Sequence, residues 1–247
     1  MGTQDQPLAA GNGATASRGL LYLALAVALV PFAFLVHRFD FLCDDAFITF
    51  RYSRNLAEGL GLVYNPPQLE APVEGYSEFL WAGLMALGMK VGASPELASR
   101  ALSVLAGVLM VAGLVRAIVR RYPDSPAAVL TSSLLLGSAP PLAVWSTGGM
   151  ATMPTAALAV ALFLVAHGAP AVDWRRRALL LGLISAGLTL MRADAALLVA
   201  LVLSPPILAG LVRRDERQWR PALAAAATGA LVFVGHMAWR HSVYGDW

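Results

Sequence analysis

The chain has 247 residues, of which 58% are hydrophobic and only 13% are charged, and its mean hydropathy is +0.65. A soluble domain has about 45–50% apolar and about 25% charged residues, so the composition excludes an ordinary soluble protein and favours lipid as the solvent. The formal net charge of +3 does not indicate nucleic-acid binding, because the arginines lie in short clusters between apolar blocks, a pattern typical of membrane proteins.

The N-terminal segment, residues 1–18, is predicted to be a disordered cytoplasmic tail, because it is rich in Gly, Ala, Thr and Gln. The rest of the chain, 19–247, is predicted to form one transmembrane domain. Its first apolar block, 20–36, is followed by His37, Arg38 and Phe39 and has no small-residue cleavage site. We therefore expect an uncleaved helix and not a signal peptide.

Further apolar blocks predict membrane-spanning helices, each of which needs about 20 mostly apolar residues. They are 101–119, 126–145, 153–166, 178–191, 195–212 and 221–239. Together with the first block they predict an all-α membrane protein with about seven transmembrane helices.

Block 79–89 is apolar but too short to cross a bilayer, and we expect it to lie in the membrane interface. The basic clusters help to orient the chain, because short basic loops stay cytoplasmic. These clusters are Arg116, Arg120 and Arg121, then Arg175, Arg176 and Arg177, then Arg213, Arg214, Arg217 and Arg220. With block 79–89 at the interface, all three arginine clusters fall on the cytoplasmic side of the membrane. An eight-helix alternative, in which 79–89 spans and the tail lies outside, also satisfies the charges.

The seven-helix topology places a long first loop, 39–98, on the outer face, together with three short segments. These segments are 146–152, 192–194 and 244–247. The polar features other than the arginine clusters therefore gather on one side of the membrane.

An acidic pair, Asp44 and Asp45, begins a segment of helical spacing that runs to residue 58 and ends at Gly59-Leu60-Gly61. A helix N-terminus stabilises negative charge, which explains one carboxylate better than two adjacent ones. Neighbours on a helix point about 100° apart, so the two aspartates would have different tasks. The preceding Cys43 is the single cysteine and cannot form an internal disulfide.

Other acidic and basic side chains are candidates on the same face. Glu74 lies beside block 79–89, where a solvated loop acid is the simpler interpretation. Arg192 and Asp194 interrupt an apolar stretch, where charges are either functional or solvated in a turn. Both interpretations stay open for that pair.

The order of these motifs resembles the first outer loop of integral-membrane GT-C glycosyltransferases. The resemblance rests on the run Asp44-Asp45-Ala46-Phe47-Ile48-Thr49-Phe50-Arg51-Tyr52, on Gly61-Leu62-Val63-Tyr64-Asn65-Pro66 and on Val73-Glu74-Gly75-Tyr76. Weaker matches follow at 145–149, 192–194 and 244–246. It is strongest to bacterial members that use polyprenyl-phosphate sugars, including cell-wall arabinofuranosyltransferases and relatives of protein mannosyltransferases.

The resemblance implies a multi-pass plasma-membrane enzyme with its active loop outside, a polyprenyl-phosphate sugar donor, and a glycan, lipid or protein acceptor. Direct attack would invert the anomeric carbon. Asp44 is the expected base, and Asp45 is the alternative base or the ligand of a divalent cation (Mg or Mn). The leaving phosphate would be stabilised by Arg51, Arg54 or that cation. The other expected substrate contacts are Glu74, Tyr76, Arg192, Asp194 and Asp246.

Two departures from the family pattern leave other functions open. Relatives often carry an acid in the second outer loop, where this chain has Gly149-Met150-Ala151-Thr152. Relatives also continue beyond the equivalent of Trp247, so the resemblance implies the N-terminal portion of a larger enzyme. The alternatives are a transporter or flippase, and a non-catalytic membrane scaffold left by truncation.

Overall fold

The computed structural model describes residues 10–66, 72–168 and 173–245, and within these ranges it contains helices and loops but no strand. The all-α prediction is confirmed. The helices are α1 (Ala10–Arg38), α2 (Asp44–Ala57), α3 (Phe79–Lys90), α4 (Pro95–Arg121), α5 (Pro126–Gly137), α6 (Pro140–Thr147), α7 (Thr152–His167), α8 (Trp174–Met191), α9 (Ala195–Val212) and α10 (Glu216–Tyr244).

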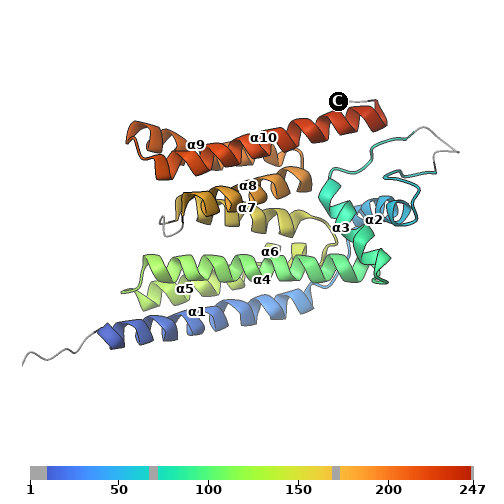
Figure 1. Cartoon of the computed structure of the whole chain (residues 1–247). Helices are drawn as coiled ribbons and strands as arrows, with labels where there is room; N and C mark the ends of the chain where they lie inside the picture. Colours follow the sequence, from blue (N-terminus) through green and yellow to red (C-terminus); the bar gives the residue numbers. More distant parts are fainter. Residues whose placement is uncertain (1–9, 67–71, 169–172, 246–247) are drawn as a thin grey trace, which may run out of the picture.

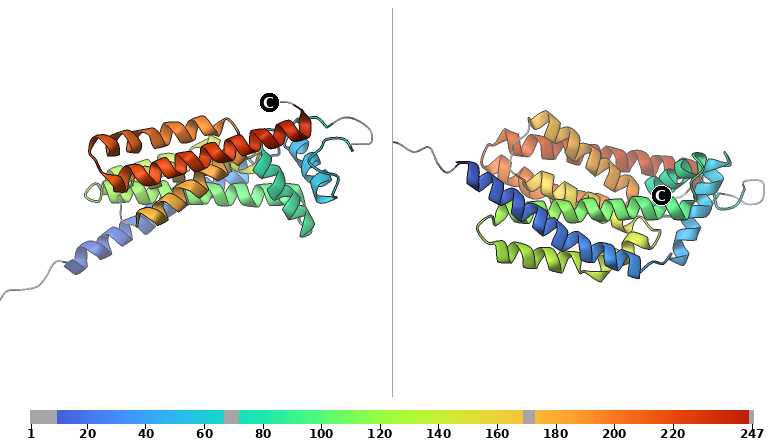
Figure 2. Two further views of the ribbon diagram at one scale, coloured as in Figure 1. Left: turned by 45° about the horizontal axis from the view of Figure 1, so that its top comes forward. Right: turned by 90° about the horizontal axis from the view of Figure 1, so that it is seen from below.

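The long helices lie side by side and run in alternating directions along the chain, whereas α2 and α3 pack on each other at one end of the bundle (Figures 1 and 2). We call this end the acidic end. It contains Asp44 and Asp45, the α6–α7 and α8–α9 turns, and the C-terminus of α10 (Figure 1). The opposite end, the arginine end, contains the three basic clusters named above.

Within the described residues, four helices are long and apolar enough to cross a membrane, namely α1 from Ser17, α4, α9 and α10. A fifth span results if the bent pair α5–α6 is counted as one. The protein is therefore suited to a membrane. By itself α7 is shorter than these spans, with 16 residues, and α8 begins with three arginines in its first turn.

One predicted block is broken. The prediction of a single helix over 126–145 is wrong, because α5 ends at Gly137 and α6 begins at Pro140 with a bend of 41°. Pro140 and Pro141 lack backbone N–H groups, and a proline also disfavours the α conformation in the residue before it. Ala139 is accordingly extended, with φ −75° and ψ 109°.

Several helices begin before the apolar blocks that predicted them. α4 begins at Pro95 and not at 101, because Ser94 caps it by accepting a hydrogen bond from the Leu97 N–H at 3.2 Å. α1 begins at Ala10, within the predicted tail, and residues 1–9 lie outside the described ranges. Hydropathy locates the apolar centre of a helix better than its polar ends.

The α1–α5 contact shows how closely the bundle packs. A Cβ added to Gly137 would lie 1.9 Å from the carbonyl oxygen of Ala28, so only glycine fits there. Small residues at such contacts allow helix backbones in lipid to approach each other. One core cluster joins α7, α8, α9 and α10, and it includes Ala195, the first residue of α9 after the α8–α9 turn.

Candidate functional site

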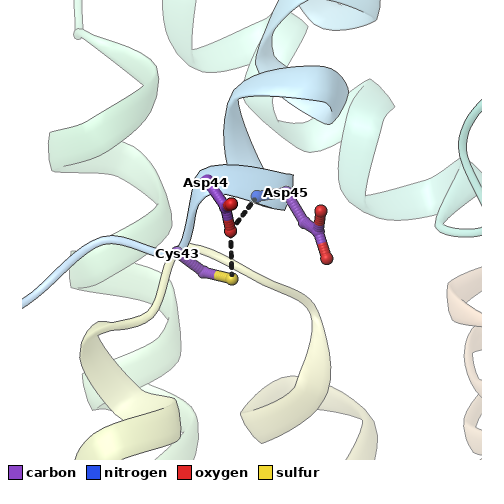
Figure 3. A group of neighbouring side chains, drawn as sticks. All are labelled: Cys43, Asp44 and Asp45. Carbon is purple, nitrogen blue, oxygen red and sulfur yellow. Dashed lines mark hydrogen bonds between the residues drawn. The ribbon is translucent and has the colours of Figure 1, made fainter.

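The acidic pair lies on the first turn of α2 and both side chains are exposed. Asp44 Oδ1 accepts a hydrogen bond from the Asp45 N–H at 3.0 Å and lies 3.5 Å from Cys43 Sγ. Figure 3 shows the Asp44 carboxylate turned back toward Cys43, whereas the Asp45 carboxylate points away from it. The two acids therefore occupy different positions at the acidic end of the bundle.

This turn is held in place by the α6–α7 turn. Cys43 N–H donates to the Gly148 carbonyl at 3.0 Å, and the indole N–H of Trp81 on α3 donates to the Gly149 carbonyl at 2.9 Å. Gly149 has φ +83°, and a Cβ there would lie 2.8 Å from the Cβ of Ala46. The left-handed backbone and this close approach both require glycine. The acidic pair is thus fixed by backbone contacts.

A cation could be held by these side chains. One ligand atom from each of Cys43, Asp44 and Asp45 lies within 4.8 Å of the others. Magnesium and manganese prefer oxygen, so the two carboxylates and not the thiol suit them. Exposed acidic groups of this kind are also common without a metal.

The two arginines predicted to contact a leaving phosphate have different surroundings. Arg51 donates from Nε to the Tyr64 carbonyl at 2.9 Å and from Nη2 to Asn65 Oδ1 at 2.8 Å. Its guanidinium also lies 4.1 Å from the centre of the Tyr64 ring. Arg51 therefore fastens the loop after α2, while Arg54 lines a separate cavity beside Lys90.

Four of the predicted substrate contacts meet in one cavity of about 290 Å³ at the acidic end. They are Glu74, Tyr76, Arg192 and Asp194, and they are joined by Ser77, Phe79, His236 and Arg240. Asp44, Asp45, Arg51 and Arg54 do not line this cavity. Asp246 lies outside the described residues.

Two ion pairs line this cavity, and the pair between Glu74 and Arg240 joins the outer loop to α10. Arg192 binds Asp194 through two hydrogen bonds of 3.0 Å each, and this contact lowers the pKa of the Asp194 carboxyl. Arg240 on α10 donates from Nε to Glu74 Oε2 at 2.6 Å, with side-chain exposures of 24% and 14%. The cavity thus presents two guanidiniums and two carboxylates, which suits a polar ligand carrying both hydroxyl and anionic groups.

The Glu74–Arg240 pair predicts a large effect for a single substitution. Arg240→Gln leaves the carboxylate of Glu74 uncompensated, and breaking a fully buried pair costs roughly 3–5 kcal/mol. Glu74 keeps some contact with solvent, so we expect a loss of about 2 kcal/mol in the free energy of unfolding in detergent. Arg220→Gln removes the exposed pair with Glu216 and should cost less than about 0.5 kcal/mol. Equal effects in the two variants would contradict this prediction.

Tyrosines fasten the outer loop to α10. Tyr52 Oη donates to the Val73 carbonyl and accepts from the Gly75 N–H, both at 2.8 Å. The hydroxyls of Tyr76 and Tyr244 lie 3.3 Å apart, and Tyr244 Oη donates to the Leu62 carbonyl at 2.6 Å. Burial raises the pKa of the Tyr76 hydroxyl, so this ring stays neutral.

Glu78 is a candidate that the sequence interpretation missed. It is only 1% exposed, and one of its carboxylate oxygens accepts a hydrogen bond from the Ala151 N–H at 3.1 Å. The other oxygen has no hydrogen-bond partner among the described residues. Burial raises the pKa of Glu78 to about 7, although the Ala151 N–H and the charge of Arg192 oppose this shift.

Glu78 lies close to Ala151, the position near which members of the resembled family often carry an acid. Ala151 has no acid of its own, but the carboxylate of Glu78 reaches its backbone from the first loop. The sequence did carry a signal for Glu78, because this acid stands directly before the apolar block 79–89, which brings it close to the membrane.

No protein-family model, no curated protein and no solved structure matches the chain.

Proposed function

We propose that the chain is the core of an integral-membrane glycosyltransferase of the GT-C type, which transfers a sugar from a polyprenyl-phosphate donor to a cell-envelope acceptor. The observation that carries the proposal is the acidic pair Asp44–Asp45, exposed to water at the end of an apolar helix bundle. A base in this position can reach a soluble acceptor while the helices contact a lipid-linked donor. The resemblance of the loop sequence supports the same conclusion.

The proposed topology has seven spans, formed by α1, α4, the bent pair α5–α6, α7, α8, α9 and α10, with α2 and α3 at the outer interface. The arginine end is placed in the cytoplasm, because basic loops remain there. The 16 residues of α7 cover about 24 Å, less than the roughly 30 Å of a hydrocarbon core, so this span relies on local thinning. Arginines at the start of α8 can extend to the interface.

Cysteine labelling tests this orientation. Cys43 is the single cysteine and is partly exposed at the acidic end. A membrane-impermeant thiol reagent should modify it in intact cells to the same extent as in permeabilised cells. Labelling that requires permeabilisation would place the acidic pair in the cytoplasm and would contradict the topology.

In the proposed reaction, the acceptor hydroxyl attacks the anomeric carbon of the donor sugar. The new bond joins the acceptor oxygen to that carbon, the bond to the phosphate oxygen breaks, and polyprenyl phosphate leaves. Asp44 takes the proton of the hydroxyl, and direct attack inverts the anomeric carbon. A divalent cation at Asp45 would neutralise charge on the leaving phosphate. The cavity of Glu74, Tyr76, Arg192 and Asp194 would bind the substrate's polar groups.

The test is transfer of a labelled sugar from a synthetic polyprenyl-phosphate donor by the full-length protein in membranes. Asp44→Asn and Asp45→Asn should abolish transfer or reduce it strongly, while Glu58→Gln, an exposed acid at the other end of α2, should leave it unchanged. Wild-type transfer by both aspartate variants would refute the proposal.

A further inference from the structure

A long groove between α4 and α7 joins two cavities of different character. At the arginine end, a cavity of about 710 Å³ is lined by Arg116, Arg120, Arg121 and His167. Farther along the same helices lies an apolar cavity of about 360 Å³. Gly113 and Leu164 line both cavities, so the basic and apolar sections adjoin there.

The basic section carries uncompensated charge. Arg116 and Arg120 are exposed, and neither is ion-paired to a carboxylate within the described ranges. They stand four residues apart on one face of α4, where like charges repel each other. Residues 169–172, which follow the cavity in the sequence, are Ala-Pro-Ala-Val, and the next residue, Asp173, does not line the cavity. An anion between the two guanidiniums would relieve this repulsion.

The arginines of α4 are not needed to neutralise the C-terminus of α7. Arg177, which is 7% exposed, already does so by donating to the carbonyls of Val165, Ala166 and Gly168. Arg120 and Arg121 lie in the last turn of α4, where their positive charges interact favourably with the dipole of that helix. Arg116 lies before that turn. Among the described residues, Arg116 therefore has no partner at either helix end, and it remains available to a ligand.

The apolar section has the length and the walls expected of an acyl-chain site. Arg116 lies 14 positions after Leu102, which corresponds to about 21 Å along α4. One leaflet contributes about 15 Å of hydrocarbon, so a complete chain fits beside this stretch. Small residues, Ala157 and Ala161, line the groove, and Leu109 at its wall is 63% exposed. The section is thus open to lipid and apolar throughout.

We propose that this groove binds one anionic phospholipid from the leaflet around the arginine end. Its phosphate lies between Arg116 and Arg120, and one acyl chain lies along the apolar section. Charge complementarity selects an anionic headgroup over a zwitterionic one, since the groove supplies cations without carboxylates. The phosphate would lie at the opposite end of the bundle from the acidic pair, whereas the apolar section extends toward α3, where Trp81 and Leu84 line it. The proposed lipid binding does not depend on sugar transfer.

Binding of dioleoylphosphatidylglycerol to the full chain in neutral detergent, titrated by native mass spectrometry, tests the proposal. One lipid should remain bound to the wild type, and Arg116→Gln with Arg120→Gln should weaken its binding about 30-fold. The matched control is Arg213→Gln with Arg217→Gln, which removes two exposed charges from the same end without touching the groove. This control should bind as the wild type does.

One further variant and two further ligands show whether binding needs the apolar section as well as the charges. Gly113→Leu narrows the junction of the two sections and keeps every charge, so it should also weaken binding. Dioleoylphosphatidylcholine and glycerol 3-phosphate should each bind at least tenfold more weakly than phosphatidylglycerol. Equal losses in the two double-arginine variants, equal binding of the zwitterionic lipid, or equal binding of glycerol 3-phosphate would each overturn the proposal.

Discussion

Replacing Asp44 by asparagine should lower the rate of sugar transfer by about 10²–10⁴-fold, which is the usual contribution of a general base. Asparagine has nearly the same size, and its carbonyl oxygen can still accept the hydrogen bond from the Asp45 N–H. The loss would therefore come from proton transfer and not from a displaced α2. Initial rates with a saturating donor measure it, and thermal unfolding of the variant checks that the fold is unchanged.

The Asp45→Asn variant distinguishes the two tasks of the acidic pair. If Asp45 holds a divalent cation, this variant should need more Mg²⁺ or Mn²⁺ for half-maximal transfer, and excess cation should restore part of the rate. Asp44→Asn should stay slow at every cation concentration. The assignment of Asp44 as the base fails if excess cation rescues Asp44→Asn and not Asp45→Asn.

Glu78→Gln should stabilise the protein at pH 8 by on the order of 3 kcal/mol relative to the wild type, and by less than about 1 kcal/mol at pH 5. The cause is the buried carboxyl, whose pKa rises from the ordinary value of 4.5 to about 7. Between these two values the folded chain keeps the proton while the unfolded chain loses it. The contribution of Glu78 to the wild-type free energy of unfolding therefore falls as the pH rises from 4.5 to 7, and above pH 7 this loss is complete. Glutamine removes this loss because it carries no charge at either pH.

Unfolding temperatures in detergent at pH 5 and pH 8 measure this difference. Arg192→Gln provides a second arm, because the positive charge of Arg192 opposes the shift of Glu78. Without that charge, the decline in stability should extend to a higher pH. An equal effect of Glu78→Gln at both pH values would show that the carboxyl of Glu78 does not titrate in this window.

Much of the helical architecture could be predicted from hydropathy alone, since a membrane helix is a continuous apolar stretch. The break between α5 and α6 could not be predicted from hydropathy, because residues 138–141, Ser-Ala-Pro-Pro, contain no charge that would divide the block, while Pro140 and Pro141 interrupt its hydrogen bonds. In contrast, α9 continues through Pro205 and Pro206. Two adjacent prolines in an apolar block therefore do not by themselves decide whether the helix is interrupted.

The residues of the cavity at the acidic end could be predicted where the helix topology alone brings them together. Alternating helices bring Glu74, Tyr76, Arg192 and Asp194 to one end, and the structure places all four around one cavity. Arg240 was missed as a partner because it is 166 residues from Glu74, and no local pattern joins them. Like Arg192, which lines the same cavity, Arg240 lies at the end of the bundle opposite the three basic clusters.

The tyrosine contacts determine when the acidic end can be completed during synthesis. Tyr76 and Tyr244 are 168 residues apart, and a ribosome adds about 5–20 residues per second. The loop that carries Glu74 and Tyr76 therefore emerges roughly 8–34 s before the helix that fastens it. During that interval the ion pair with Arg240 and the Tyr244 hydrogen bonds do not yet exist. The cavity is assembled only after the last described helix joins the bundle.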